Sequence, residues 1–398
     1  MFSSLVRLAV QWSRFLLVRV VLFAMLALVS VAASLFFGDM IPQKISRFVG
    51  EEAMNTIVNT LAASMLAVTT FSLSIMLAAY QSAAGAMTPR SRLVLRQDRV
   101  TQSVLATFVG AFVFSLVVII LRATPLIGEK ERFLLFCATV IVVILVLVAM
   151  VRWIRRLETL GANDDTLIKL ERHAINAMKN FIQSPALGAH VWSACERDEM
   201  EGAPGVRATR PGYVQQIMEG ILQEVAVEHD LFVYAVVRTG DYVVPGQTLA
   251  YAEGLPEKAR DGLRRAFYIR SERSFEQDPR LGVQVMTEVA SRALSSAVND
   301  PQTAVDVAHR LSAVFCQKAG KHSGKVTCGR VWVIPQDLGE MMRQSYGVIM
   351  RDAKGNEEVL EAARESLSRV ARHGEERVAK LAEQMLEDSR QKGQHSVE

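Results

Sequence analysis

The first 151 residues alternate long apolar runs with short charged segments. Four runs carry no charged side chain, and each has about the length that a helix needs to cross a bilayer, roughly 20 residues. They are Val20–Gly38, Ala53–Pro89, Val100–Leu121 and Phe133–Val151. A soluble core helix rarely stays uncharged over such a length, so the pattern predicts an α-helical membrane domain of four transmembrane helices over residues 1–151.

The first of these runs has an alternative explanation. Ser30-Val31-Ala32 fits the small-residue end of a cleaved signal peptide. The apolar run continues through Phe37, which favours a membrane span.

Basic residues are unevenly divided among the segments that flank the four runs. Ten lie before the first run, between the second and third, and just after the fourth, against five in the other two loops. Because Lys and Arg stay on the cytoplasmic side, we expect both termini and everything after Val151 in the cytoplasm. One of these loops carries Arg90, Arg92, Arg96 and Arg99. They can contact lipid phosphates or serve only to orient the spans.

The second run is unusual because it is long and carries small and hydroxylated residues at helical spacing. Its candidate functional residues are Thr60, Ser64, Ser74 and Gln81, which share one helix face. Close packing between helices is the simpler explanation of such a face, and the lining of a water-filled path is the alternative. No run has a charged residue at its centre, which speaks against a proton-coupled pump or a voltage sensor.

The remaining residues predict a mixed α+β cytoplasmic domain. We expect 152–184 to be a helical connector that continues the fourth span, 185–258 to be rich in β-structure, and 259–398 to be mainly helical, with one or two strands near 325–335. Leu231–Arg238 reads as a β-branched and aromatic strand, and Leu263–Ile269 as the end of a helix.

Two Asp-Pro pairs mark helix starts in the helical region. Asp278-Pro279 and Asp300-Pro301 each place a capping residue before a proline that suits the first turn. We expect helices over Pro279–Val298 and Pro301–Lys318, joined at Asn299 as a tight hairpin. The alternating charges of 356–391 suit a solvated helix pair or a coiled-coil assembly face.

Composition agrees with a membrane protein that carries a large soluble part. Half of the 398 residues are hydrophobic, 22% are charged, and the mean hydropathy is +0.20. These values exclude a disordered chain, a collagen-like fibre and a small disulfide-stapled secreted protein. The net charge of +4 comes from the apolar half, so it is no argument for nucleic acid as a partner. No cysteine lies in a C-x-x-C pair, and we expect no metal site.

Polar residues gather around the two Asp-Pro pairs. Arg273, Asp278, Arg292, Asn299 and Asp300 are the candidate cytoplasmic site, which can bind an anion or a nucleotide between packed helices. Helix capping with a buried ion-pair network is the simpler explanation. No nucleophile, base and metal-ligand set meets the requirements of a catalytic site, so we assign no catalytic residue.

Two resemblances follow from these motifs. The segment Gly240–Leu249, G-D-Y-V-V-P-G-Q-T-L, resembles small barrel-sandwich domains that carry biotin or lipoate, but Ala250–Leu255 supplies no attachment lysine. This implies a small barrel-sandwich-like β unit and no cofactor. The string R-A-L-S-S-A-V-N-D-P-Q-T-A, Arg292–Ala304, resembles a bacterial family of predicted inner-membrane proteins of unknown function. That family usually has proline near Ser296.

The family resemblance extends over nearly the whole chain. It implies four spans with a cytosolic domain in the bacterial inner membrane, and it implies no reaction. The polar face of the second run, the lack of catalytic motifs and the large domain that follows the fourth run favour a homo-oligomeric channel or transport protein, embedded in the lipid bilayer, with a cytoplasmic assembly and gating domain. The alternative is a membrane-anchored sensor or scaffold whose cytoplasmic domain binds a small ligand or a protein partner.

Overall fold

The computed structural model describes residues 16–37, 51–86, 88, 90, 99–123, 129–157, 163–192, 204–320, 324–353 and 355–395. The chain divides into two compact units. The helical unit comprises Met1–Ala86 and Arg92–Asp165, and the α/β unit comprises Met87–Ser91 and Thr166–Glu398. Thr88 and Arg90 thus belong to the α/β unit, although they follow a helix of the other one.

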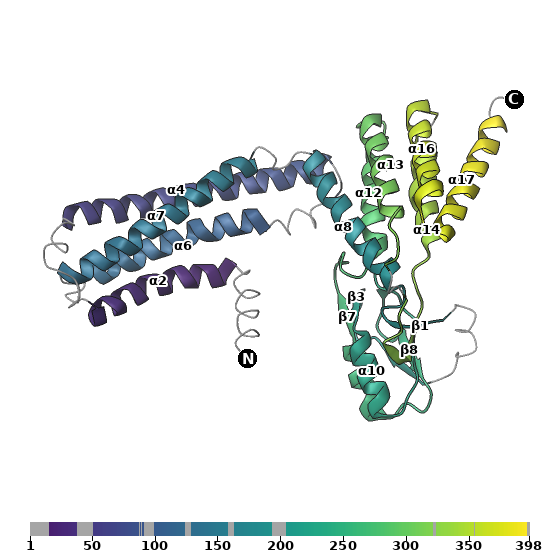
Figure 1. Cartoon of the computed structure of the whole chain (residues 1–398), viewed down its shortest axis with the longest axis horizontal. Coiled ribbons are helices and arrows are strands. Elements are labelled where there is room, and N and C mark those ends of the chain that lie inside the picture. Colours follow the sequence, from purple (N-terminus) through teal and green to yellow (C-terminus); the bar gives the residue numbers. More distant parts are fainter. Residues whose placement is uncertain are drawn as a thin grey trace. The chain divides into compact units, whose positions relative to one another are not determined.

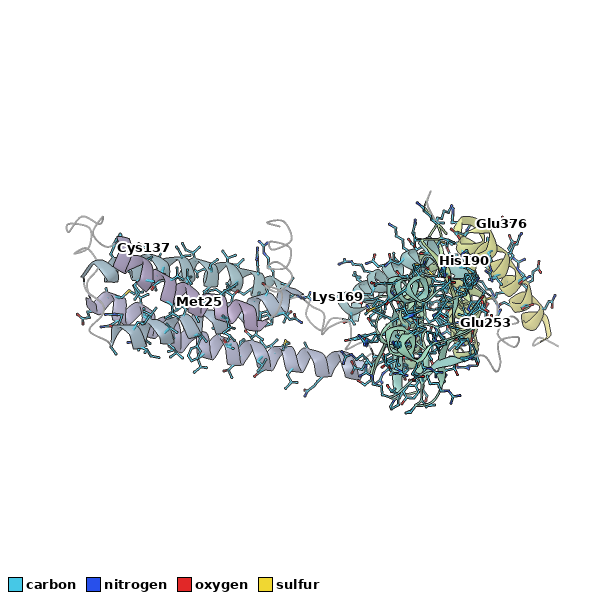
Figure 2. All side chains as sticks on the ribbon, turned by 90° about the horizontal axis from the view of Figure 1, so that it is seen from below. Met25, Cys137, Lys169, His190, Glu253 and Glu376 are labelled. Carbon is cyan, nitrogen blue, oxygen red and sulfur yellow. The ribbon has the colours of Figure 1, made fainter. Side chains whose placement is uncertain are left out.

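The helical unit is a bundle of long apolar helices that lie side by side (Figure 1). Its helices are α2, Leu16–Phe37; α4, Glu51–Ala86; α6, Arg99–Arg122; and α7, Glu129–Leu157. α6 contacts the other three. The core is apolar and includes Met54 of α4, Phe108 and Phe114 of α6, and Leu135 of α7, all fully buried. Most side chains that project from this bundle carry only carbon, as around Met25 (Figure 2).

Three of these helices are long and apolar enough to cross a membrane. Their spanning segments are Glu52–Ala79, Val100–Arg122 and Phe133–Leu157, which match the second, third and fourth predicted runs. The first predicted run lies in α2, where the continuous apolar stretch is shorter, Val20–Ser30. The described residues thus contain three apolar helices of membrane-spanning length and a mixed helical and sheet unit, as predicted, whereas the fourth crossing stays a prediction.

A small residue allows one close helix contact in this bundle. A Cβ atom added to Gly110 of α6 would overlap the ring of Phe23 in α2. Ala106 and Ala111 beside it are buried. Small residues permit such approaches in membrane bundles, where van der Waals packing holds helices together.

The α/β unit contains two sheets that share one apolar core. The larger sheet has the strand order β1-β8-β4-β6-β2, with β8 parallel to both β1 and β4. Its strands are β1, Ala189–Val191; β8, Cys328–Val333; β4, Val233–Ala235; β6, Thr248–Ala252; and β2, Gly205–Arg207. The smaller sheet pairs β3, Gly212–Ile217, with β5, Tyr242–Val243, and with β7, Phe267–Arg270.

The sheets differ from the expected β unit of 185–258 because β7 and β8 come from farther along the chain. The helix expected over Leu263–Ile269 is wrong: α11, Glu257–Arg265, ends earlier, and the next residues form β7. The reason is tertiary, because Phe267 and Ile269 fill the core beside β3. α7 ends at Leu157 and α8 begins at Asn163, and the residues between them lie outside the described part of the chain.

The other helices of the α/β unit stand beside the sheets, with α12, α13, α16 and α17 roughly side by side (Figure 1). They are α8, Asn163–Gln183; α10, Glu219–Glu228; α12, Pro279–Ala293; α13, Pro301–Phe315; α14, Leu338–Met342; the π-helical turn η3, Arg343–Gly347; α15, Val348–Asp352; α16, Glu357–His373; and α17, Glu376–His395.

Both Asp-Pro helix starts are confirmed. The Asp278 carboxylate accepts a hydrogen bond from the Arg280 N–H, and that of Asp300 accepts one from the Thr303 N–H. α12 ends at Ala293 rather than Val298, and the connection to α13 uses Asn299 in a left-handed conformation, φ 50°. That conformation suits asparagine better than most residues with a Cβ atom.

Candidate functional site

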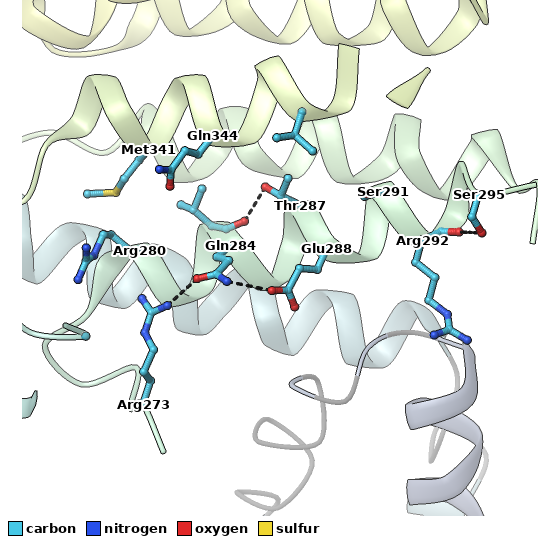
Figure 3. Close-up of a pocket in the computed structure, with 13 residues that line it drawn as sticks. Arg273, Arg280, Gln284, Thr287, Glu288, Ser291, Arg292, Ser295, Met341 and Gln344 are labelled. Atoms are coloured by element: carbon cyan, nitrogen blue, oxygen red, sulfur yellow. Dashed lines mark hydrogen bonds between the residues drawn. The ribbon is translucent and has the colours of Figure 1, made fainter. Parts of the chain in front are cut away.

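A cavity of about 640 Å³ follows one face of α12. Figure 3 shows Arg280, Gln284, Glu288 and Arg292 one helical turn apart along this face, with Arg273 beside them. The spacing of four residues places their side chains above one another on the helix. The volume lies within the range of pockets that bind small organic ligands, roughly 300–1,000 Å³.

Asp278 anchors the first end of the cavity wall. Its carboxylate is about 1% exposed and contacts two arginines. Arg273 donates from Nε to Oδ2 at 2.7 Å, with Nη2 2.6 Å from the same oxygen. The Nε of Arg280 lies 3.8 Å from Oδ1, while its Nη2 donates to Asp241 at 2.7 Å and to the Thr239 carbonyl at 2.8 Å.

Two features of the surroundings of Asp278 act on its pKa in opposite directions. Burial raises the pKa of this carboxyl above its ordinary value, because the charged form loses hydration. The charges of Arg273 and Arg280 oppose this rise without cancelling it. Two cations around one buried carboxylate therefore hold the start of α12, and Gly240 permits their approach, because a Cβ there would collide with Asp278.

A chain of polar contacts continues from this anchor along α12. Arg273 donates from Nη1 to the Gln284 side-chain oxygen at 2.5 Å, and Gln284 donates in turn to Glu288 at 2.9 Å. Glu288 also forms an ion pair with Arg90. Arg90 lies four residues beyond Ala86, where α4 ends. The contacts therefore connect the buried Asp278 to the segment that follows a predicted membrane span.

The opposite wall of the cavity comes from the helices after β8. Met341 and Gln344 face α12 from α14 and the π-helical turn (Figure 3), and Val348 of α15 continues this wall. Hydroxyl groups of Thr287, Ser291 and Ser295 line the α12 side; that of Ser291 also bonds to Asp352. The cavity thus offers an apolar surface next to hydrogen-bonding groups.

The charges that line the cavity favour an anion. Arg273, Arg280 and Arg292 are the basic lining residues, and Glu288 is the acidic one. Guanidinium groups bind carboxylates and phosphates through paired hydrogen bonds.

The structure brings together three of the five residues of the predicted cytoplasmic site. Arg273 and Arg292 line the cavity, and Asp278 lies directly behind it. Asn299 and Asp300 lie beyond the end of α12 and are not among the lining residues; Asp300 caps α13. Sequence reasoning missed Arg280, Gln284 and Glu288, although their spacing on a predicted helix was a usable signal.

The candidate residues of α4 lie on its outer face within the single chain. Thr60, Ser74 and Gln81 are exposed, and Ser64 is half-buried. The hydroxyls of Ser64 and Ser74 donate to carbonyls of their own helix, Leu61 and Thr70. The packed face of α4 is apolar instead, with Met54, Val58, Leu61 and Met65 in the core.

The predicted lipid-contact arginines are described only in part. Arg90 is half-exposed and pairs with Glu288. Arg92 and Arg96 lie outside the described residues, as does the side chain of Arg99 at the start of α6. Lipid contact by these arginines stays a prediction.

The fold is that of a helical membrane protein joined to a mixed α/β unit. The model of a family described as "Predicted membrane protein (DUF2254)" matches residues 13–369, and the chain belongs to this family. Its resemblance to a membrane family of unknown function is thereby confirmed.

Similar curated proteins come from mycobacteria. The uncharacterized proteins Rv1290c of Mycobacterium tuberculosis and Mb1321c of Mycobacterium bovis are each 37% identical to the chain over 114 residues. These residues are 27% of this chain and 22% of each relative, so the chain covers less than a quarter of their length. No solved structure matches the chain.

Proposed function

We propose that this chain is a membrane-anchored sensor whose α/β unit binds a small organic anion in the α12 cavity. The polar chain from Asp278 through Arg273, Gln284 and Glu288 to Arg90 carries this proposal. An anion that binds Arg273 competes with the side-chain oxygen of Gln284 for its guanidinium, and Gln284 is the group that donates to Glu288, the partner of Arg90. The partner of Arg90 then changes close to the end of α4.

A binding measurement on the full chain tests the sensor function. We expect pyrophosphate or ATP, titrated into the chain in lipid nanodiscs, to bind in the cavity. Arg292→Gln removes a lining cation and should weaken binding about tenfold, the typical effect of one charge-assisted hydrogen bond. Arg372→Gln, on the exposed face of α16, is the matched control and should leave binding unchanged.

Two results would contradict this assignment. One is that no binding is detected, by calorimetry or by a change in electrophoretic mobility, with pyrophosphate, ATP or citrate. These three ligands together sample phosphate and carboxylate anions. The other is binding that Arg292→Gln and Arg372→Gln weaken equally, because a general loss of positive charge would then explain it.

A homo-oligomeric channel or transport protein is the second candidate function. It is supported by the outer face of α4, where Thr60, Ser74 and Gln81 are exposed while the apolar face packs in the bundle. In an assembly of several copies, this face can line a path or pack against a neighbour. The α/β unit would then assemble and gate the path.

Conductance in planar bilayers tests the channel. Thr60→Leu and Ser74→Leu should reduce a measured ion current, because each replaces a polar lining group with an apolar one. Leu66→Ile, an exposed apolar position on the same helix, is the control. If no ion current is measured under voltage, tension and varied ions while the α12 cavity still binds its ligand, the channel function is contradicted and the sensor function remains.

For both candidate functions we propose four crossings of the bacterial inner membrane, with both termini in the cytoplasm. This topology is supported by the distribution of Lys and Arg and by the helical α2.

A further inference from the structure

A second cavity, of about 750 Å³, lies in the α/β unit between the segment 339–355 and helices α16 and α17. Its apolar lining consists of four long side chains, Met350, Leu360, Leu381 and Met385, all half-buried. Met side chains adapt to the shape of an apolar partner because they are unbranched and flexible, and Leu side chains add apolar surface that is stabilised by burial. The floor of this cavity therefore suits an extended apolar group.

Basic groups stand at the same cavity. Arg343, Arg351 and Arg364 line it, against a single lining carboxylate, Asp388. Arg351 pairs with Asp352 at 2.8 Å, and Arg364 pairs with Glu357 at 3.0 Å. Arg343 is exposed, and its guanidinium makes no hydrogen bond or ion pair with the described residues. It is the cation available to an incoming anion.

The backbone leaves room beside Arg343. Gly347 lines the cavity, and a Cβ atom added there would meet no atom within 4 Å. Both residues belong to the π-helical turn η3, a backbone form that is frequent at functional sites. The same turn presents Gln344 to the α12 cavity, so the two cavities share a wall.

We propose that this second cavity binds an amphiphilic anion with an acyl chain. The acyl chain lies against Met350, Leu360, Leu381 and Met385, and the anionic head lies at Arg343. A free fatty acid and an anionic phospholipid share this chemistry. The inference goes beyond the proposed sensor function, because it concerns other residues and holds whether or not the α12 cavity binds a ligand.

Photolabelling tests the site in the full chain, reconstituted in phosphatidylcholine nanodiscs. One arm adds a photoactivatable palmitate from solution, and the other builds a photoactivatable phosphatidylglycerol into the disc. Mass spectrometry then quantifies labelling of the peptides that contain Met350 and Met385. We expect labelling there in at least one arm; the arm that labels identifies the source. Palmitate should compete for the label about tenfold better than palmityl alcohol, which lacks the charge.

Two variants and two matched controls make the result specific. Gly347→Leu fills the cavity and should abolish labelling of these peptides. Arg343→Gln should remove the preference for palmitate over palmityl alcohol, while the acyl chain still binds. Gly220→Leu, equally open on α10, and Arg377→Gln, equally exposed on α17, should behave as the wild type.

Clear outcomes overturn the proposal. The proposal is overturned if neither peptide is labelled in either arm. It is also overturned by labelling that persists in Gly347→Leu, and by equal competition by palmitate and its alcohol in the wild-type chain.

Discussion

Asp278 illustrates how one residue serves both local structure and the site. Its carboxylate caps α12 through the Arg280 N–H, and it also holds the guanidinium groups of Arg273 and Arg280. Burying a charge is costly unless it is paired and hydrogen-bonded. The pairing therefore fixes where the arginines at the start of the α12 cavity stand.

Asp278→Asn should change how stability depends on pH. Asparagine also caps helices well, so the start of α12 is retained. The pKa of Asp278 is raised in the folded chain from its ordinary 3.8. The folded state therefore binds this proton more tightly than the unfolded state, and the stability of the wild type relative to Asp278→Asn should fall as the pH rises above the ordinary pKa of 3.8. Thermal unfolding of both proteins across this range measures the difference. A difference that grows with pH would contradict the raised pKa.

At the scale of single residues, the sequence predicts contacts between residues that are close in the chain, and it does not predict contacts between residues that are far apart in it. Asp278-Pro279 and Asp300-Pro301 were predictable because a cap and its N–H partner lie within three residues. The ion pair of Arg90 with Glu288 joins residues 198 positions apart, and no spacing rule connects them. Arg273 and Arg292 could be named as site residues, but not the cavity between them and Met341.

Helices α8 and α12 approach each other at a glycine. A Cβ atom added to Gly282 would lie 2.5 Å from the Cβ of Ala174, closer than real contacts allow. The close approach brings α12 against α8 on the side away from the cavity-lining residues. The position of the cavity wall thus depends on a residue without a side chain.

Gly282→Ala should destabilise the α/β unit by about 1–3 kcal/mol, the usual cost of overpacking a buried contact. The better helix propensity of alanine offsets at most about 1 kcal/mol of this cost. Gly220→Ala in α10 is the same chemical change in open space, so its stability should be unchanged or slightly higher. Urea unfolding of both variants compares them. Equal stabilities would show that α8 moves aside without cost.

The type of a secondary-structure element was predictable where its apolar pattern extends over many residues, and uncertain where the pattern covers only a few. The spans of α4, α6 and α7 follow from composition, because uncharged runs of this length have few other uses. β7 has only four residues and follows an amphipathic helix, so its pattern reads as helix until β3 pairs with it. The π-helical turn Arg343–Gly347 has no sequence signature that distinguishes it from α-helix.

At the scale of the whole molecule, the number of crossings decides the sidedness of both units. An even number places the N-terminus and the α/β unit on the same side, and an odd number separates them. α4, α6 and α7 supply three candidate spans, and α2 is the fourth by sequence. The sensor function requires its anion cavity in the compartment that holds the ligand, so sidedness bears directly on function.

Cysteine labelling in intact cells determines the number of crossings and the side of the membrane on which the α/β unit lies. In a chain whose native cysteines are replaced by alanine, single cysteines are placed at Ser3, Lys44 and Glu253. Four crossings with cytoplasmic termini predict that a membrane-impermeant maleimide reaches only Lys44→Cys, and that Ser3→Cys and Glu253→Cys react after lysis alone. Labelling of Ser3→Cys from outside, with Glu253→Cys still protected, would reduce the spans to three, because α2 would then lie outside the bilayer. External labelling of Glu253→Cys would reverse the orientation, and the α12 cavity would then face ligands outside the cytoplasm.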